Sequence, residues 1–138
     1  RLRLRHKPAH SNMMQRNLVT SVLLNESIRT TKKRAEVIQP LVEKMITIAK
    51  KKEPYIAIRA INAVVTNKNA CRKTMEVLKF RFSDRQSGFT RMVPLGMRAG
   101  DGAKVVVLSL VEGNDVAPKA AKAPKEKKVP KVKAPAKK

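Results

Sequence analysis

Apolar residues recur with helical spacing along most of the first 82 positions. The clearest stripe has intervals of three and four: Ala35, Ile38, Val42, Met45 and Ala49. This spacing places side chains on one face of an α-helix, which packs that face against a core. The helix is expected to begin after Thr31, whose hydroxyl can cap it. Pro40 predicts a kink within the helix or a break at Gln39.

Three further segments show the same periodicity. A first helix is predicted from Asn12 to Asn25, where Asn12 and Gln15 resemble a capping box. A third begins at Pro54, a residue suited to the first helical position, and a fourth follows a turn and cap at Asn67. Their apolar positions are Met14, Leu18 and Val22; Ala57, Ile58, Ile61, Val64 and Val65; and Cys71, Met75, Leu78 and Phe82.

The pattern changes to that of strands after a predicted loop at residues 83–88. Residues 89–95 and 104–111 are expected to pair as a hairpin across a glycine-rich connection. The second strand is almost continuously apolar, which predicts burial on both faces. Residues 27–31 form a short strand able to join them. The resulting fold class is α+β, a two-layer single domain with about four helices on a small mixed three-stranded sheet.

The charge of the chain indicates what kind of partner it binds. It carries 32 Lys and Arg against 10 Asp and Glu, a formal +22, while 42% of its residues are hydrophobic. Disordered basic chains lack the apolar residues for a core. A foldable chain of such charge repels itself unless a polyanion neutralises it. Nucleic acid is the natural partner, because its phosphates release counterions when Lys and Arg bind.

Composition divides the chain into three parts. Residues 1–11 form a basic RNA-binding arm, residues 12–112 the α+β core, and residues 113–138 a Lys/Ala/Pro-rich tail predicted to be flexible and disordered. From Gly113 onward there are nine Lys and two acids, whereas residues 1–112 hold 23 Lys and Arg and eight acids. The folded part is therefore strongly basic in its own right.

No catalytic, cofactor or metal site stands out. His6 and His10 lack a cysteine partner and the spacing of a metal site. The single cysteine, Cys71, lies on an apolar helical face and is expected to pack in the core. The Gly100–Lys104 segment lacks the spacing of a phosphate-binding loop, and no apolar run is long enough to span a membrane. An enzyme and a membrane protein are both disfavoured.

The candidate RNA-binding residues are basic side chains in the arm, at the strand-to-helix transition and around the hairpin. They are Arg1, Arg3, Arg5, His6, Lys7, His10, Arg16, Arg29, Lys32, Lys33, Arg34, Arg81, Arg85, Arg91, Arg98 and Lys104. Arginine favours forked contacts with phosphate and stacking on bases. Ordinary solvated surface charge is the alternative for each group, and for the lysines at 50–52 it has equal weight.

Several short motifs then occur in the order found in a known family. The later ones are Arg81-Phe82, Arg85, Ser87-Gly88-Phe89-Thr90-Arg91, Arg98-Ala99-Gly100-Asp101-Gly102-Ala103 and Leu108-Ser109-Leu110-Val111. The earlier ones are His10, Arg16-Asn17-Leu18, Asn25-Glu26-Ser27-Ile28-Arg29-Thr30-Thr31 and Met45-Ile46-Thr47-Ile48-Ala49-Lys50. Over residues 6–112 the chain resembles bacterial-type large-subunit ribosomal protein seventeen.

The resemblance implies a structural ribosomal protein without enzyme activity or cofactor. It implies binding to large-subunit ribosomal RNA near the peptide exit tunnel, beside neighbouring ribosomal proteins. A DNA-compacting nucleoid-type protein is the alternative, because its basic tail would look similar. A bacterial cytoplasm is favoured, and a mitochondrial or plastid ribosome stays open, since the Arg1–Arg5 stretch can also be interpreted as part of an organelle presequence.

Overall fold

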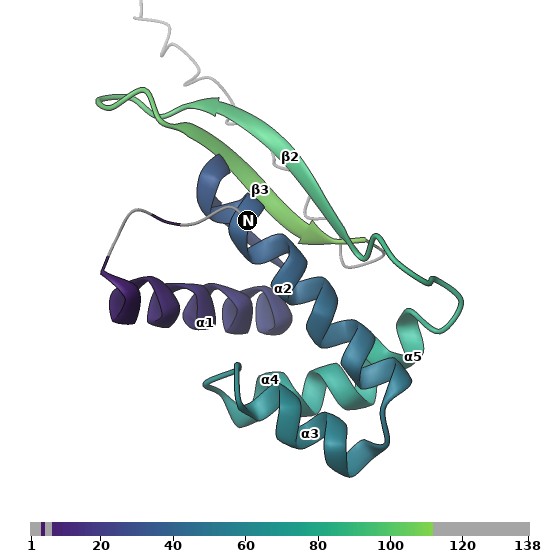
Figure 1. Cartoon of the computed structure of the whole chain (residues 1–138). Coiled ribbons are helices and arrows are strands. Elements are labelled where there is room, and N and C mark those ends of the chain that lie inside the picture. The colour runs from purple at the N-terminus through teal and green to yellow at the C-terminus, as the bar shows by residue number, and fades with distance from the viewer. Residues whose placement is uncertain (1–3, 5–6, 112–138) are drawn as a thin grey trace, which may run out of the picture.

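The computed structural model describes residue 4 and residues 7–111, and these form helices packed beneath one small sheet (Figure 1). The elements in chain order are α1 (Pro8–Asn25), β1 (Ser27–Thr31), α2 (Lys32–Lys51), α3 (Pro54–Asn62), α4 (Lys68–Lys73), the π-helical segment η1 (Thr74–Leu78), α5 (Lys79–Arg81), β2 (Thr90–Met97) and β3 (Lys104–Leu110). The predicted α+β class is confirmed.

The sheet has the strand order β1-β3-β2, and both pairings are antiparallel. The prediction of a mixed sheet is therefore wrong. The short connection makes β2 and β3 an antiparallel hairpin, and β1 pairs with the free edge of β3 in the same direction as β2. In register, Arg29 lies opposite Val107 and Arg91 opposite Ser109. A bulge between Pro94 and Gly96 shifts the hairpin pairing near its tip.

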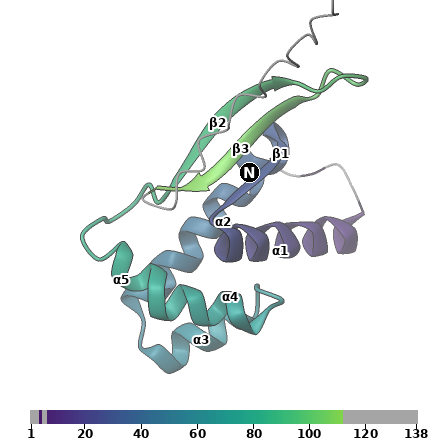
Figure 2. The same ribbon diagram turned by 180° about the vertical axis from the view of Figure 1, so that it is seen from behind.

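The core lies between one face of the sheet and the helices. Val106, Leu108 and Leu110 alternate along β3 and are almost fully buried in one core with helical residues such as Ile38 and Leu78. Seen from behind, the helices again lie on the same side of the sheet (Figure 2). The prediction that β3 is buried on both faces holds only in part. Val105 is buried on the second face, but Val107 and Ser109 are half-buried.

Helix α1 begins earlier than the sequence pattern indicated. It begins at Pro8 rather than Asn12, with Lys7 at the capping position and no side-chain cap. The predicted capping box is absent, since Gln15 donates to the Ser11 hydroxyl at 3.1 Å. Proline at the first helical position needs no N–H donor and has a preset φ, which explains this start. Residues 8–11 of the predicted arm are therefore helical.

Helix α2 passes through Pro40 without the predicted break at Gln39. Pro40 itself is exposed, while Ile38 and Val42 on either side of it are fully buried. Proline inside a helix costs about 3 kcal/mol. Burying two large aliphatic side chains contributes a similar or larger amount, so tertiary packing offsets the local penalty. Thr31 occupies the predicted cap position, but its side chain makes no capping bond.

The fourth predicted helix is composite. It runs through α4, η1 and α5, and its middle segment is π-helical, a feature that the sequence pattern did not reveal. Asn67 caps its start as predicted, accepting from the Asn69 amide at 2.8 Å. In α3 the apolar stripe is only partly correct, because Ala57 and Ile61 are buried whereas Ile58 is 43% exposed.

Candidate nucleic-acid interface

The described part of the chain is strongly cationic. It contains 20 Lys and Arg against seven Asp and Glu, a net charge of +13. These charges have two different environments. Some basic side chains bind acceptors within the protein, and others project from the surface without an internal partner. The distinction decides which of the predicted residues are available to a polyanion.

Arg16 is used internally. Its guanidinium donates to the carbonyl oxygens of Ala63 and Val64, both at 3.0 Å. This contact joins α1 to the segment that follows α3, whose last carbonyls lack helical partners. Arg16 therefore stabilises the packing of α1 against this segment, whereas its position in the sequence suggested an RNA contact.

Arg81 belongs to a semi-buried ion cluster centred on Glu26. Its fork donates to the two Glu26 carboxylate oxygens at 2.8 and 3.2 Å, and Lys73 contacts the same carboxylate at 2.7 Å. The Glu26 side chain is only 12% exposed. Hydrogen bonding from Arg81 is the largest influence that lowers the Glu26 pKa to about 2, with Lys73 lowering it further against the opposing effect of burial.

Glu26 also occupies an unusual backbone position. It ends α1 with a left-handed φ of 63°, and no other non-glycine residue in the described part has a positive φ. Its amide donates to the Val22 carbonyl at 2.8 Å, and its carbonyl accepts from the Leu110 amide at 2.8 Å. This one residue thus links α1, β1, the end of β3 and the composite fourth helix.

Arg98 stabilises the hairpin tip. It forms a two-pronged ion pair with Asp101, which also accepts from the Ala103 amide at 3.2 Å. These contacts hold the pKa of Asp101 well below its usual range, with the Arg98 hydrogen bond as the main cause. Gly100 and Gly102 turn with φ of 104° and 62°, conformations that favour glycine. The predicted glycine-rich connection is confirmed, and the exposed guanidinium of Arg98 is paired with Asp101 within it.

The loop at residues 83–88 is held by Lys50, which the sequence left undecided. Its ammonium donates to the Arg85 carbonyl and lies 5.4 Å from the centroid of the Phe89 ring. Phe89 in turn packs on Phe82 with ring centroids 5.1 Å apart. Arg85 is exposed, and its guanidinium reaches the Gly88 carbonyl at 3.4 Å. The position of Lys50 at the end of α2 was the only signal of this role in the sequence.

A second environment exists on the side of the sheet opposite the helices, here called the outer sheet face. Alternation along the strands and their register place these residues on it: Ser27, Arg29, Thr31, Arg91, Val93, Val105, Val107 and Ser109. Arg29 and Arg91 are exposed and have no hydrogen bond or ion pair within the described residues. None of the three strands contains an acidic residue.

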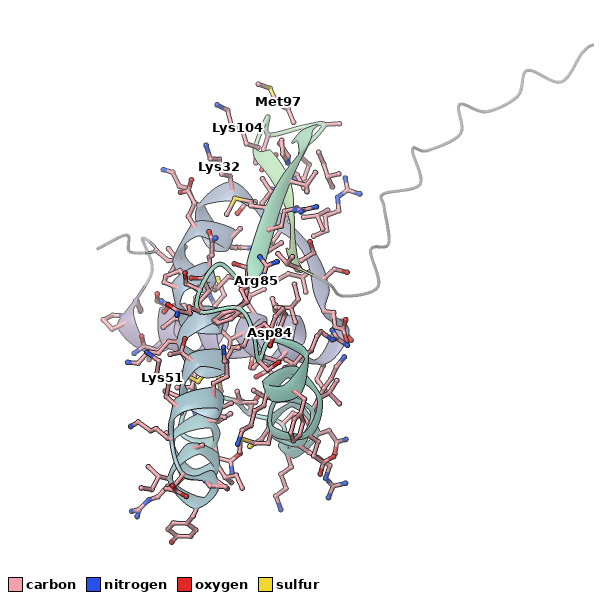
Figure 3. All side chains as sticks on the ribbon, turned by 90° about the vertical axis from the view of Figure 1, so that its right-hand side faces the viewer. Lys32, Lys51, Asp84, Arg85, Met97 and Lys104 are labelled. Carbon is pink, nitrogen blue, oxygen red and sulfur yellow. The ribbon has the colours of Figure 1, made fainter. Side chains whose placement is uncertain are left out.

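The outer sheet face continues into a basic corner. Figure 3 shows Lys32, Lys104 and Met97 together at one end of the molecule, where β1 passes into α2 beside the hairpin. Lys33 is exposed here, Arg34 is half-buried, and Lys32 lies 3.8 Å from Glu36. The structure thus brings Arg29, Lys32, Lys33 and Lys104 to neighbouring positions from two distant stretches of sequence.

The remaining candidates lie at or beyond the start of α1. Lys7 is exposed at the helix cap, and His10 is exposed in the first turn. Arg1, Arg3, Arg5 and His6 lie outside the described residues. Cys71 is 5% exposed within the core, and burial raises the pKa of its thiol, so the prediction of core packing is confirmed.

Among the described residues, no group of three or more His, Cys, Asp or Glu side chains could hold a metal ion. Among the helices of that same region, none has the length and apolar character needed to cross a membrane.

Comparison with known proteins identifies the family. The model of the family described as "Ribosomal protein L17" matches residues 14–111. The chain belongs to the ribosomal protein L17 family. The match covers the whole composite of helices and sheet described above except the first residues of α1, and it agrees with the family resemblance drawn from the ordered motifs.

Bacterial relatives support the same assignment. The large ribosomal subunit protein bL17 of Syntrophotalea carbinolica is 37% identical over 127 residues, which cover 92% of this chain and 81% of the relative. That of Desulforudis audaxviator is 38% identical, covering 79% and 96%, and that of Clostridium novyi is 43% identical, covering 74% and 89%. As a member of the L17 family the chain is a structural protein of the large ribosomal subunit and not an enzyme.

Proposed function

We propose that the chain binds large-subunit ribosomal RNA, neutralises its phosphates and holds RNA segments together near the peptide exit tunnel. The observation that carries this proposal is the acid-free outer sheet face, where Arg29 and Arg91 have no partner within the described residues. Two unpaired guanidinium groups on one face favour the binding of an external polyanion, because that binding releases counterions.

The basic corner extends this surface. Lys32, Lys33 and Lys104 meet where α2 begins, so their charges reinforce the positive end of a 20-residue helix. Contacts with RNA are expected mainly at phosphates and sugars, since the narrow major groove of duplex RNA hides its base edges from side chains. The packed core gives these cations a rigid support, which lowers the entropy lost on binding.

The other parts of the chain complete the proposal. The basic arm adds Arg1, Arg3, Arg5 and His6 beside Lys7, and residues 113–138 add nine lysines. The cations of the arm and the tail add to the charge of the core for binding to RNA and to neighbouring ribosomal proteins. The bacterial relatives favour assembly in a bacterial cytoplasm, with an organelle ribosome as the other setting.

Sucrose-gradient sedimentation of a cell lysate tests this function. The chain should sediment with large subunits and stay bound through a moderate salt wash. Treatment with ribonuclease should release it, whereas deoxyribonuclease should not. A chain found mainly free, or one that follows DNA after the RNA is digested, would contradict ribosomal RNA binding and would favour the DNA-compacting alternative.

A further inference from the structure

We propose that the outer sheet face binds an unpaired stretch of RNA by stacking and forked contacts from Arg29 and Arg91, rather than by general attraction to a duplex. This inference rests on the proposed RNA-binding function and specifies the form of RNA that this face accepts. It is drawn from the placement of two arginines, three hydroxyl groups and a valine-lined centre on one face.

The two arginines lie on opposite sides of the central strand. Arg29 is on β1 opposite Val107, and Arg91 is on β2 opposite Ser109. Neighbouring strands are separated by about 4.8 Å, so the two edge strands are about 10 Å apart. The arginines are also offset by two residues along β3. They therefore flank a part of the outer sheet face whose width matches a base and its sugar.

Two rows of side chains cross the sheet in this area, one apolar and the other polar. Val93 and Val107 are half-buried, so their methyl groups contribute to the surface. Ser27 and Ser109 form the adjacent row with Arg91. Apolar surface favours the flat face of a base, and serine hydroxyls bond to ribose or phosphate oxygens. A duplex, whose bases are stacked inside, would leave the valine surface without a partner.

Arginine is also the appropriate cation for an unpaired base. The planar guanidinium stacks on a base and forms two parallel bonds with phosphate, which the ammonium of lysine cannot do. The described chain has no aromatic residue on this face, because its Tyr and Phe residues lie in the helices and in the loop before β2. Guanidinium stacking is thus the means of base contact that the face provides.

The test replaces both arginines by lysine in the full chain, R29K with R91K, so that the charge is unchanged. Three probes are titrated: an unstructured single-stranded RNA, the same strand in a perfect duplex, and a large-subunit ribosomal RNA transcript. Wild-type protein should prefer the single strand to the duplex. The double variant should bind the single strand about tenfold more weakly and the duplex almost unchanged.

Arg59 supplies the matched control. It is exposed on α3, away from the sheet, and makes no side-chain bond within the described residues. R59K should bind all three probes as the wild type does. Circular dichroism of each variant checks that the fold is retained, which is expected because Arg29 and Arg91 are exposed.

The outcomes separate the inference from the function on which it rests. Equal binding by wild type and the R29K/R91K variant, or a wild-type preference for the duplex, would overturn the stacking inference while leaving RNA binding intact. Wild-type protein that binds the ribosomal transcript no better than an unrelated RNA of equal length would instead count against the proposed function itself.

Discussion

Arg81 and Arg91 are ten positions apart and belong to neighbouring motifs of one ordered set, yet the structure places them in opposite environments. Arg81 is bound by Glu26 in a semi-buried cluster, while Arg91 projects from the outer sheet face without a partner among the described residues. The difference is that the Glu26 carboxylate at the end of α1 contacts Arg81, whereas no acidic side chain of the described residues contacts Arg91. We therefore propose RNA contacts at those cations for which the fold provides no internal acceptor.

The same comparison separates Arg16 and Arg98 from Arg29. The first two donate to backbone carbonyls and to Asp101 respectively, whereas Arg29 has no such contact. Internal pairing of some arginines stabilises the platform from which the others project. The two groups should therefore respond differently to mutation, one through stability and the other through affinity.

The largest effect is expected at the Glu26 cluster. Glu26→Gln removes the charge that Arg81 and Lys73 bind, and the lowered pKa corresponds to about 3 kcal/mol of stabilisation at neutral pH. The free energy of unfolding, measured by urea denaturation, should fall by about 2–3 kcal/mol. Glu76→Gln is the control, because its pairing with Arg72 is exposed and 3.9 Å long. Equal losses in the two variants would show that the cluster has no special weight.

The pH dependence of stability tests the same cluster without a mutation. The folded-state pKa of Glu26, about 2, lies below the ordinary value of 4.5. Its contribution is therefore complete above about pH 5 and is lost as the pH falls towards 2. Between those values wild-type protein should lose more stability than the Glu26→Gln variant. Parallel curves for both proteins would contradict the assignment of the shift to Glu26.

A sharper test measures both RNA affinity and stability for variants of Arg81 and Arg91. Arg91→Ala should weaken binding to large-subunit RNA by about 1–3 kcal/mol and leave the urea midpoint unchanged. Arg81→Ala should lower stability by about 1–2 kcal/mol through loss of its forked contact, with a smaller change in RNA affinity of the folded protein. Filter binding at two salt concentrations measures the first quantity. Equal affinity losses would abolish the distinction between the two groups.

A related comparison sets Arg91 of the sheet against Arg3 of the predicted arm. Arg3→Ala should weaken RNA binding less than Arg91→Ala, because Arg91 is positioned by a strand within a three-stranded sheet. Filter-binding titrations of the two variants, run side by side, provide the measurement. Equal losses would indicate that the number of charges alone determines affinity.

A smaller effect is expected at Lys50. Lys50→Ala removes the bond to the Arg85 carbonyl and the contact with the Phe89 ring, which together contribute about 1 kcal/mol. Amide hydrogen exchange at residues 83–88 should become faster. Lys51→Ala is the control, because Lys51 is exposed and makes no side-chain bond within the described residues. Unchanged exchange in the Lys50 variant would mean that other contacts hold the loop.

The smallest effect concerns residues 113–138. Their Lys/Ala/Pro composition provides too few apolar groups to offset the entropy of ordering. Removing them after Glu112 should leave the thermal midpoint almost unchanged and reduce RNA affinity in a manner that disappears at high salt. A large drop in the thermal midpoint would show that these residues pack on the core.

Much of the architecture was predictable from local pattern. The stripe from Ala35 to Ala49 and the hairpin strands were identified because periodic apolar residues must face a core in either kind of element. The antiparallel direction of β1 and the π-helical segment were not, and the pattern left open whether α2 continues through Pro40 or breaks at Gln39. Each depends on contacts between segments far apart in the chain, and local propensity carries little information about them.

The candidate site also has features that the sequence determined and features that depend on tertiary contacts. By itself the sequence determined the family, the α+β class and the excess of positive charge, since these follow from ordered motifs, periodicity and composition. Only the tertiary structure decided which arginines are available, because availability depends on whether an acceptor from another segment lies within bonding distance. Glu26 lies 55 positions before Arg81 but contacts it directly. Arg29 and Arg91, 62 positions apart, share an open face because both edge strands pair with β3.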